Sequence, residues 1–124
     1  MSARPRVAWW SPLPPDPSGI ADYSAELLPR LARLWDVDLF VDGGKTLPAL
    51  ADRHRVVDAL GVDAVARLAE YDAVVYQLGN SPAHESAYRA LLEHPGLVVL
   101  HDVSLTHLVI EMTHGRGRTD RLFA

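Results

Sequence analysis

The sequence contains no cysteine, and this absence limits the chemistry that the protein can use. It excludes disulfide bonds and thiolate metal sites, and it is typical of proteins in a reducing compartment. Long apolar runs are also missing. None approaches the ~20 residues that a membrane-spanning helix needs, and residues 1–5 lead into the first apolar segment without a signal-peptide core. We therefore expect a soluble, cytoplasmic protein without a transmembrane segment, the alternative being peripheral membrane association of a full-length form.

Positive charge and metal-ligand patterns are scarce as well. The 12 lysines and arginines are outnumbered by 16 aspartates and glutamates, which gives a formal net charge of −4 at pH 7. With no basic stripe among the aromatic residues, we do not expect nucleic acid as a partner. His101 and His107 would face different sides of a helix, so their spacing does not suggest zinc. We expect no bound metal, and we expect His84 and the other scattered histidines to lie at the surface.

The pattern that is present is an alternation of short apolar runs with segments of helical periodicity. At 124 residues, with 48% hydrophobic and 23% charged residues, the chain suits one globular domain. The predicted strands are residues 7–10, 36–42, 55–57, 72–78 and 97–100, and the predicted helices are residues 20–34, 47–53, 63–71, 84–93 and 104–112. This alternation predicts the α/β class, with a Rossmann-like, doubly wound and mainly parallel sheet of about five strands in an order such as 3-2-1-4-5.

The apolar pattern differs between strands and helices in ways that predict burial. Residues 36–42 alternate, with Phe40 on the more polar face, so we expect this strand to be half exposed and near an edge. Residues 72–78 are apolar on both faces, as in the covered centre of a parallel sheet. In the helix that follows them, we expect Leu91 and Leu92 to point inward.

The segment Gly43-Gly44-Lys45-Thr46 is similar to the end of a phosphate-binding P-loop but lacks the rest of that motif. The motif requires a glycine at the position that Leu39 occupies, inside a predicted strand. We therefore predict a simple turn.

The loop between the first strand and the first helix is the strongest candidate for a ligand site. Its proline-rich residues 11–18 lead to Gly19, and Ser18 is a good N-cap because its hydroxyl can accept from an unpaired amide of the first helical turn. Unpaired amides and the helix dipole favour an anion there, and Gly19 would let a phosphate approach the backbone closely. One glycine does not make a dinucleotide fingerprint. A strand–helix turn that binds nothing is the alternative.

Polar residues also follow the fourth and fifth predicted strands, namely Asn80, Ser81, His101 and Asp102. The carboxyl ends of parallel strands share one edge, and ligands bind where strand order reverses, so we expect these residues to converge with the loop on one crevice. His101 can donate to a sugar hydroxyl or a phosphate, or else satisfy a buried carbonyl. Asp102 can orient His101 or cap the next helix. Asn80 and Ser81 can contact a ligand or turn the chain.

Three stretches stand out together: Trp9-Trp10-Ser11-Pro12-Leu13-Pro14-Pro15, Pro17-Ser18-Gly19-Ile20-Ala21-Asp22-Tyr23-Ser24 and Val98-Val99-Leu100-His101-Asp102-Val103-Ser104-Leu105. With them the chain resembles the N-terminal domain of GT-B glycosyltransferases, specifically the retaining group of family 4. The resemblance runs over nearly the whole chain, from Val7 to about Met112.

The resemblance implies a two-domain hexosyltransferase that moves a sugar, with retention, from a nucleotide-sugar donor to a carbohydrate or lipid-linked acceptor. In that family the glycine after the first strand approaches the donor diphosphate, which implies this role for Gly19 together with Ser18. The histidine closing the fifth strand lies over the donor sugar, which implies a catalytic role for His101. Such enzymes generally need no bound metal or other cofactor. The residues left as acceptor or sugar contacts are Asn80, Ser81 and Asp102.

The resemblance also implies that residues 1–124 form an incomplete, acceptor-side domain, the C-terminal nucleotide-sugar domain being absent. We then expect the chain alone to be inactive, and the strand of residues 97–100 to be an exposed apolar edge that is prone to association. The alternative is a stand-alone α/β binding or regulatory module that holds an anion in its crevice without catalysis.

Overall fold

Five parallel strands form one sheet in the order β3-β2-β1-β4-β5. The computed structural model describes residues 4–101 and 106–113. The strands are β1 (Arg6–Trp10), β2 (Asp36–Val41), β3 (Val56–Asp58), β4 (Ala73–Leu78) and β5 (Leu97–Leu100). The helices are α1 (Gly19–Leu31), α2 (Pro48–Ala51), α3 (Ala64–Arg67), α4 (Glu85–Glu93) and α5 (Thr106–Thr113), with 3₁₀ turns η1 (Asp42–Gly44), η2 (Leu68–Glu70) and η3 (Pro82–His84). The predicted fold class and strand order are both confirmed, and the described sheet is wholly parallel.

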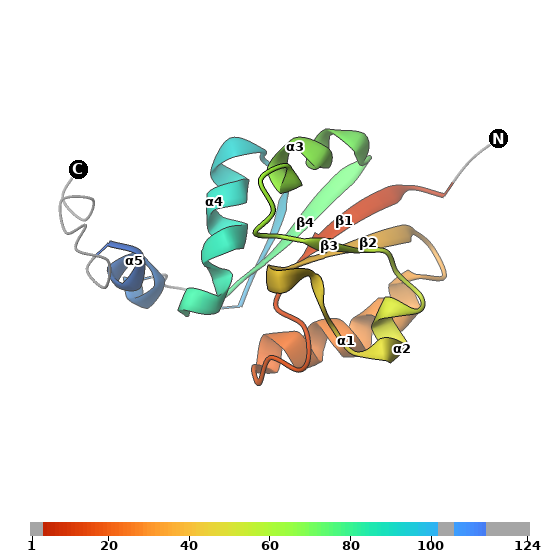
Figure 1. The fold of residues 1–124 in the computed structure, drawn as a ribbon, viewed down its shortest axis with the longest axis horizontal. Coiled ribbons are helices and arrows are strands. Elements are labelled where there is room, and N and C mark those ends of the chain that lie inside the picture. The colour runs from red at the N-terminus through yellow and green to blue at the C-terminus, as the bar shows by residue number, and fades with distance from the viewer. Residues whose placement is uncertain (1–3, 102–105, 114–124) are drawn as a thin grey trace.

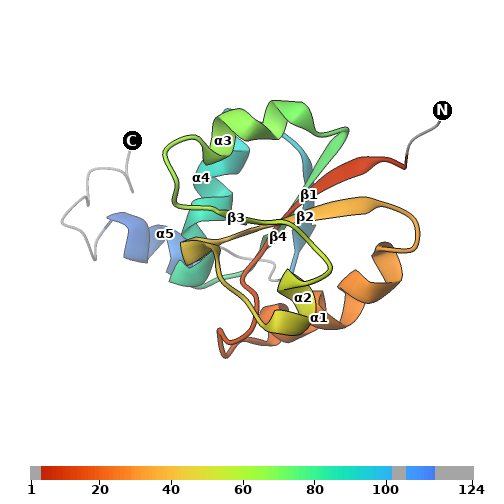
Figure 2. The ribbon, with the colours of Figure 1, turned by 45° about the vertical axis from the view of Figure 1, so that its right-hand side comes forward.

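Helices cover both faces of this sheet. Figure 1 shows α1 and α2 on one face and α3 and α4 on the other, and Figure 2 shows the same two layers from a second direction. Each layer has its own buried cluster. The cluster under α1 and α2 includes Val7, Trp9, Leu28, Leu39 and Leu50. The cluster under α3 and α4 includes Trp10, Phe40, Leu68, Tyr76 and Ala87.

The central strand β1 belongs to both layers, because adjacent residues of a strand point to opposite faces. The indole of Trp10 stacks on Phe40, with ring centroids 5.2 Å apart. On the other face, Trp9 Nε1 donates to Ser24 Oγ of α1 at 3.1 Å. Both tryptophans are almost fully buried, so β1 fixes the sheet to the helices on each side.

The strand β2 is more buried than its sequence pattern predicts. It lies next to the edge strand β3, so the predicted place near an edge is right, but the predicted half exposure is wrong, since Phe40 has no exposed surface. The environment of Asp38 explains why the alternating pattern predicts too much exposure for this strand. Its carboxylate accepts from Tyr71 Oη at 2.6 Å and lies 3.7 Å from the Arg6 guanidinium. The charge in the alternating pattern therefore marks a paired group and not a solvent-facing side.

The helix α4 exists as predicted, but its inward residues differ. Ala87 and Ala90 are buried and Leu91 packs against the same cluster, whereas Leu92 is 67% exposed. Positions 87, 90 and 91 share one helical face, and position 92 lies about 100° further round. The predicted inward orientation of Leu92 is therefore wrong. The helix predicted over residues 63–71 is divided between α3 and η2.

The strand β5 is an exposed apolar edge. Among the described residues it pairs with β4 alone, and Leu97 and Leu100 are 62% and 52% exposed. An unpaired edge with apolar side chains offers backbone donors and acceptors to a second chain.

We predict that the 124-residue chain self-associates through this edge and that Leu97→Lys reduces the association, because charge on an edge strand opposes pairing. Leu92→Lys is the matched control, since Leu92 is similarly exposed but belongs to the helix α4 and not to the edge strand. Size-exclusion chromatography with light scattering measures the mass over a concentration series. A chain that stays monomeric throughout, or an equal effect of both substitutions, would contradict the prediction.

Candidate functional site

The ends of β4 and β5 and the start of α1 border one hollow at the carboxyl edge of the sheet. Its volume is about 340 Å³, and its lining residues are Ser18, Gly19, Ile20, Asn80, Ser81, His84 and His101. We call this cavity the glycine hollow. It brings together five of the six residues predicted from the sequence as site residues. The sixth, Asp102, lies outside the described residues.

Ser18 caps α1 as predicted. Its side chain accepts from the Ala21 amide at 3.0 Å, and its own backbone is extended. The first amides of a helix have no acceptor within the helix. Since Ser18 takes the amide of Ala21, the amides of Gly19 and Ile20 are the first-turn donors beside the hollow, which both residues line. Within the described part of the chain no hydrogen bond of these two amides is found. The positive end of the helix dipole and donor amides at the same point favour a bound anion.

Gly19 lies beneath open space. Among the described residues, a Cβ built on Gly19 would meet no atom within 4 Å, whereas a Cβ on Gly79 would lie 2.5 Å from Ile20 Cδ1 and 2.8 Å from His84 Nε2. Gly79 is therefore required by packing at the hollow's inner wall. No packing contact explains a glycine at position 19, so a ligand can approach the backbone there.

His101 is held in place by β4 and α1. Its amide donates to the Leu78 carbonyl at 2.9 Å, and its Nε2 lies 2.7 Å from Gln77 Oε1. An amide oxygen only accepts, so Nε2 carries the proton in this bond and Nδ1 is left for other partners. The ring also meets Tyr23 edge-on, with centroids 5.0 Å apart. The imidazole is thus fixed while one side of it remains half exposed in the hollow.

Gln77 is a residue of this site that sequence reasoning missed. It has no exposed surface, and its Nε2 has no hydrogen-bond partner in the described part of the chain. A polar residue in the otherwise apolar run of residues 73–78 was the available signal.

His84 is buried and not at the surface, so the expectation for it is wrong. It is 2% exposed, and its Nδ1 donates to the Gln77 carbonyl at 2.9 Å. The ring packs under Gly79 and lines the hollow. Because a carbonyl accepts the Nδ1 proton, His84 joins η3 to β4 and supports the wall on which Gln77 and His101 lie.

Asn80 and Ser81 line the hollow, but each also has a structural bond. Asn80 Oδ1 accepts from the Leu108 amide at 3.0 Å and so joins α5 to the segment after β4. The Ser81 carbonyl accepts from the His84 amide at 3.1 Å. Both of the functions weighed for these residues, turning the chain and facing a ligand, are therefore compatible with their positions.

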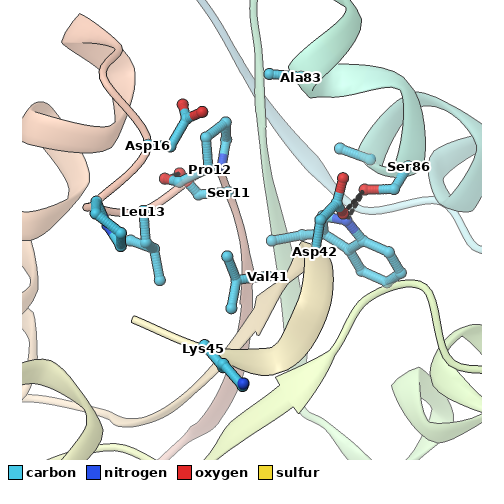
Figure 3. Close-up of a pocket in the computed structure, with 12 residues that line it drawn as sticks. Ser11, Pro12, Leu13, Asp16, Val41, Asp42, Lys45, Ala83 and Ser86 are labelled. Carbon is cyan, nitrogen blue, oxygen red and sulfur yellow. Dashed lines mark hydrogen bonds between the residues drawn. The ribbon is translucent and has the colours of Figure 1, made fainter. Parts of the chain in front are cut away.

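A second cavity lies on the other side of the β1–α1 loop. Its volume is about 340 Å³, and its lining residues are Trp10, Ser11, Pro12, Leu13, Pro15, Asp16, Val41, Asp42, Lys45, Ala83, Ser86 and Ala87. We call it the proline pocket (Figure 3). The segment Gly43-Gly44-Lys45-Thr46 borders it as the predicted turn, with positive φ at Gly43 and Gly44, and Thr46 Oγ1 donates to the Pro14 carbonyl at 2.7 Å.

Asp42 is an exposed carboxylate of the proline pocket that accepts a hydrogen bond from Ser86. Trp10 Nε1 donates to Ser86 Oγ at 3.0 Å, and Ser86 Oγ donates to Asp42 Oδ1 at 2.6 Å. Sequence reasoning missed this pocket because Asp42 was assigned to the exposed face of a strand. Its position just after the carboxyl end of β2 was the signal that could have found it.

Within residues 4–101 and 106–113, no group of three or more histidine and acidic side chains is arranged to hold a metal ion. None of the described helices is long and apolar enough to cross a membrane. Comparisons of the chain with protein-family models, with curated proteins and with solved structures gave no match. The fold and the two cavities are therefore the basis for a functional proposal.

We predict that Gly79→Ala lowers the free energy of unfolding by about 1–3 kcal/mol, because the added methyl group overpacks the wall formed by Ile20 and His84. Gly19→Ala should change it by no more than about 0.5 kcal/mol, since its methyl group meets open space. Urea unfolding followed by circular dichroism compares the two variants. Equal destabilisation would contradict the assignment of Gly79 to packing and of Gly19 to an open ligand site.

Proposed function

We propose that the chain is the acceptor-side, Rossmann-like domain of a retaining glycosyltransferase that uses a nucleotide-sugar donor and acts with a C-terminal domain. The observation that supports this most is that Ser18, Gly19 and His101 line one hollow. These are the residues to which the resemblance assigns the donor diphosphate and the donor sugar. Most of the chain lies between Ser18 and Gly19 on one side and His101 on the other. The donor and the acceptor are substrates in this proposal, and no metal or other cofactor is invoked.

The chemistry of the hollow suits a sugar diphosphate. The amides of Gly19 and Ile20, at the positive end of α1, can donate to phosphate oxygens as negative charge develops on the leaving group. His101 can contact a sugar hydroxyl through Nδ1, which accepts from the hydroxyl when the ring is neutral and donates to it when the ring is protonated. Gln77 keeps the ring oriented for that contact.

The geometry also fits a reaction between two bound molecules. The segment of residues 11–20 lines the glycine hollow on one side and the proline pocket on the other. A donor in the first cavity and an acceptor in the second would lie at the same sheet edge, on either side of the β1–α1 loop. Transfer further requires the acceptor hydroxyl to reach the donor sugar in a reactive geometry. A second domain would complete the donor site by holding the nucleotide.

We predict that Gly19→Val lowers donor affinity about tenfold or more when the chain is assayed together with the C-terminal domain. A branched side chain would prevent charge-assisted hydrogen bonds between phosphate and the first-turn amides. Calorimetric titration with a nucleotide-sugar measures the affinity, and thermal unfolding checks the fold. Gly19→Ala is the matched variant, for which a smaller loss is expected. A folded Gly19→Val variant with unchanged affinity would remove the phosphate role and support the non-catalytic binding module.

We also predict that His101→Ala reduces sugar transfer by ~10²–10⁴-fold, the usual cost of removing a positioned group of this kind, while nucleotide binding is largely kept. His94→Ala is the control, because His94 lies at the end of α4 and lines neither cavity. A loss below about tenfold in transfer rate would make His101 a structural residue.

A further inference from the structure

The proline pocket shares no lining residue with the glycine hollow, and its chemistry is different. We propose that it binds a single neutral ring bearing several hydroxyl groups, an unphosphorylated monosaccharide or cyclitol. The assignment of this ring as the acceptor rests on the proposed glycosyltransferase function, whereas binding of the ring itself can be measured without it.

The size and walls of the proline pocket suit one ring. Small-molecule sites range over about 300–1,000 Å³, and the volume here, about 340 Å³, is at the lower end of that range. Pro12, Leu13 and Val41 form apolar surface at its back and side (Figure 3). Apolar side chains of this kind can pack against the carbon-bound hydrogens of a sugar ring.

Hydroxyl recognition is provided by carboxylates on two sides of the pocket. Figure 3 shows Asp42 and Ser86 facing each other on one side and Asp16 on the loop opposite. Ser86 donates to Asp42 Oδ1 at 2.6 Å, which orients the carboxylate. An ionised carboxylate only accepts hydrogen bonds, so it suits a ligand that presents hydroxyl donors.

The charges of the lining argue against an anionic ligand. Asp16 and Asp42 contribute two negative charges and Lys45 one positive charge, so the charged lining residues are net negative. A phosphorylated ring would place further negative charge beside these carboxylates, and like charges brought together are unfavourable. The helix amides favour an anion in the glycine hollow, whereas the two carboxylates outnumber Lys45 in the proline pocket and favour hydroxyl donors there.

The two cavities are neighbours along the same two segments. Residues 11–16 and Ser86 border the proline pocket, whereas residues 18–20 and His84 border the glycine hollow. The β1–α1 loop and the start of α4 therefore lie between a ring in the proline pocket and the glycine hollow.

The experiment is a binding assay on the 124-residue chain with four probes: glucose, mannose, myo-inositol and glucose 6-phosphate. Saturation-transfer NMR detects the bound ring, and titration gives its affinity. We expect at least one neutral probe to bind and glucose 6-phosphate to bind more weakly than glucose. Asp42→Asn should lower the affinity for the neutral ring about tenfold or more, because a charge-assisted hydrogen bond is lost. Ser86→Ala should lower this affinity less, since the Asp42 carboxylate remains.

Two kinds of control make the result specific. Asp52→Asn removes an exposed carboxylate at the end of α2, outside the pocket, and should not alter ring binding. Gly19→Val and His101→Ala should also leave ring binding unchanged. The result for the proposed donor site can therefore be told apart from the result for this pocket. No binding by any neutral ring, tighter binding of the phosphate, or equal effects of Asp42→Asn and Asp52→Asn would overturn the proposal.

Discussion

The parallel pairing of β1 with β2 on one side and β4 on the other decides where the groups of both cavities lie. Strand order reverses at the β1–β4 pair, so the chain leaves β1 toward a helix on one face and β4 toward a helix on the other. A hollow opens between the two exits. Trp9 and Trp10 hold β1 by packing into both layers, and a shift in the register of this strand would displace the loop, the N-cap and Gly19 together.

A buried hydrogen-bond network keeps the start of α1 fixed on this strand. Ser24 has no exposed surface, and its hydroxyl accepts from Trp9 Nε1 and lies 2.8 Å from Ser11 Oγ. Buried polar groups of this kind are costly unless paired, so the network tolerates one position of α1 against β1. The amides of Gly19 and Ile20 are therefore aimed before any ligand arrives, which is the preorganisation that a binding site needs.

Local rules predicted most of the fold and the glycine hollow, because each rule acts within a few residues. The spacing of apolar residues located the strands, and Ser18 before Gly19 marked the start of the helix. The carboxyl ends of parallel strands necessarily lie at one edge of the sheet. What failed depends on contacts between distant segments. Asp38 accepts from Tyr71, which is 33 residues away. His84 is buried beneath Gly79, where its ring donates to the Gln77 carbonyl. The proline pocket exists because the β1–α1 loop and the start of α4 lie opposite each other. The sequence of either segment alone does not predict this arrangement.

Carboxylates at the amino edge of the sheet lie in ion pairs, whereas Asp42 at the carboxyl edge does not within the described residues. This difference favours the carboxyl edge as the place for a ligand. At the amino edge Asp36 and Asp38 lie near Arg4 and Arg6, and burial together with Asp38 raises the pKa of Tyr71 above its usual range. At the carboxyl edge no ion pair among the described residues involves Asp42, and its carboxylate is oriented by Ser86 toward a cavity. An oriented, unpaired carboxylate has hydrogen-bonding capacity left for a molecule that enters the pocket.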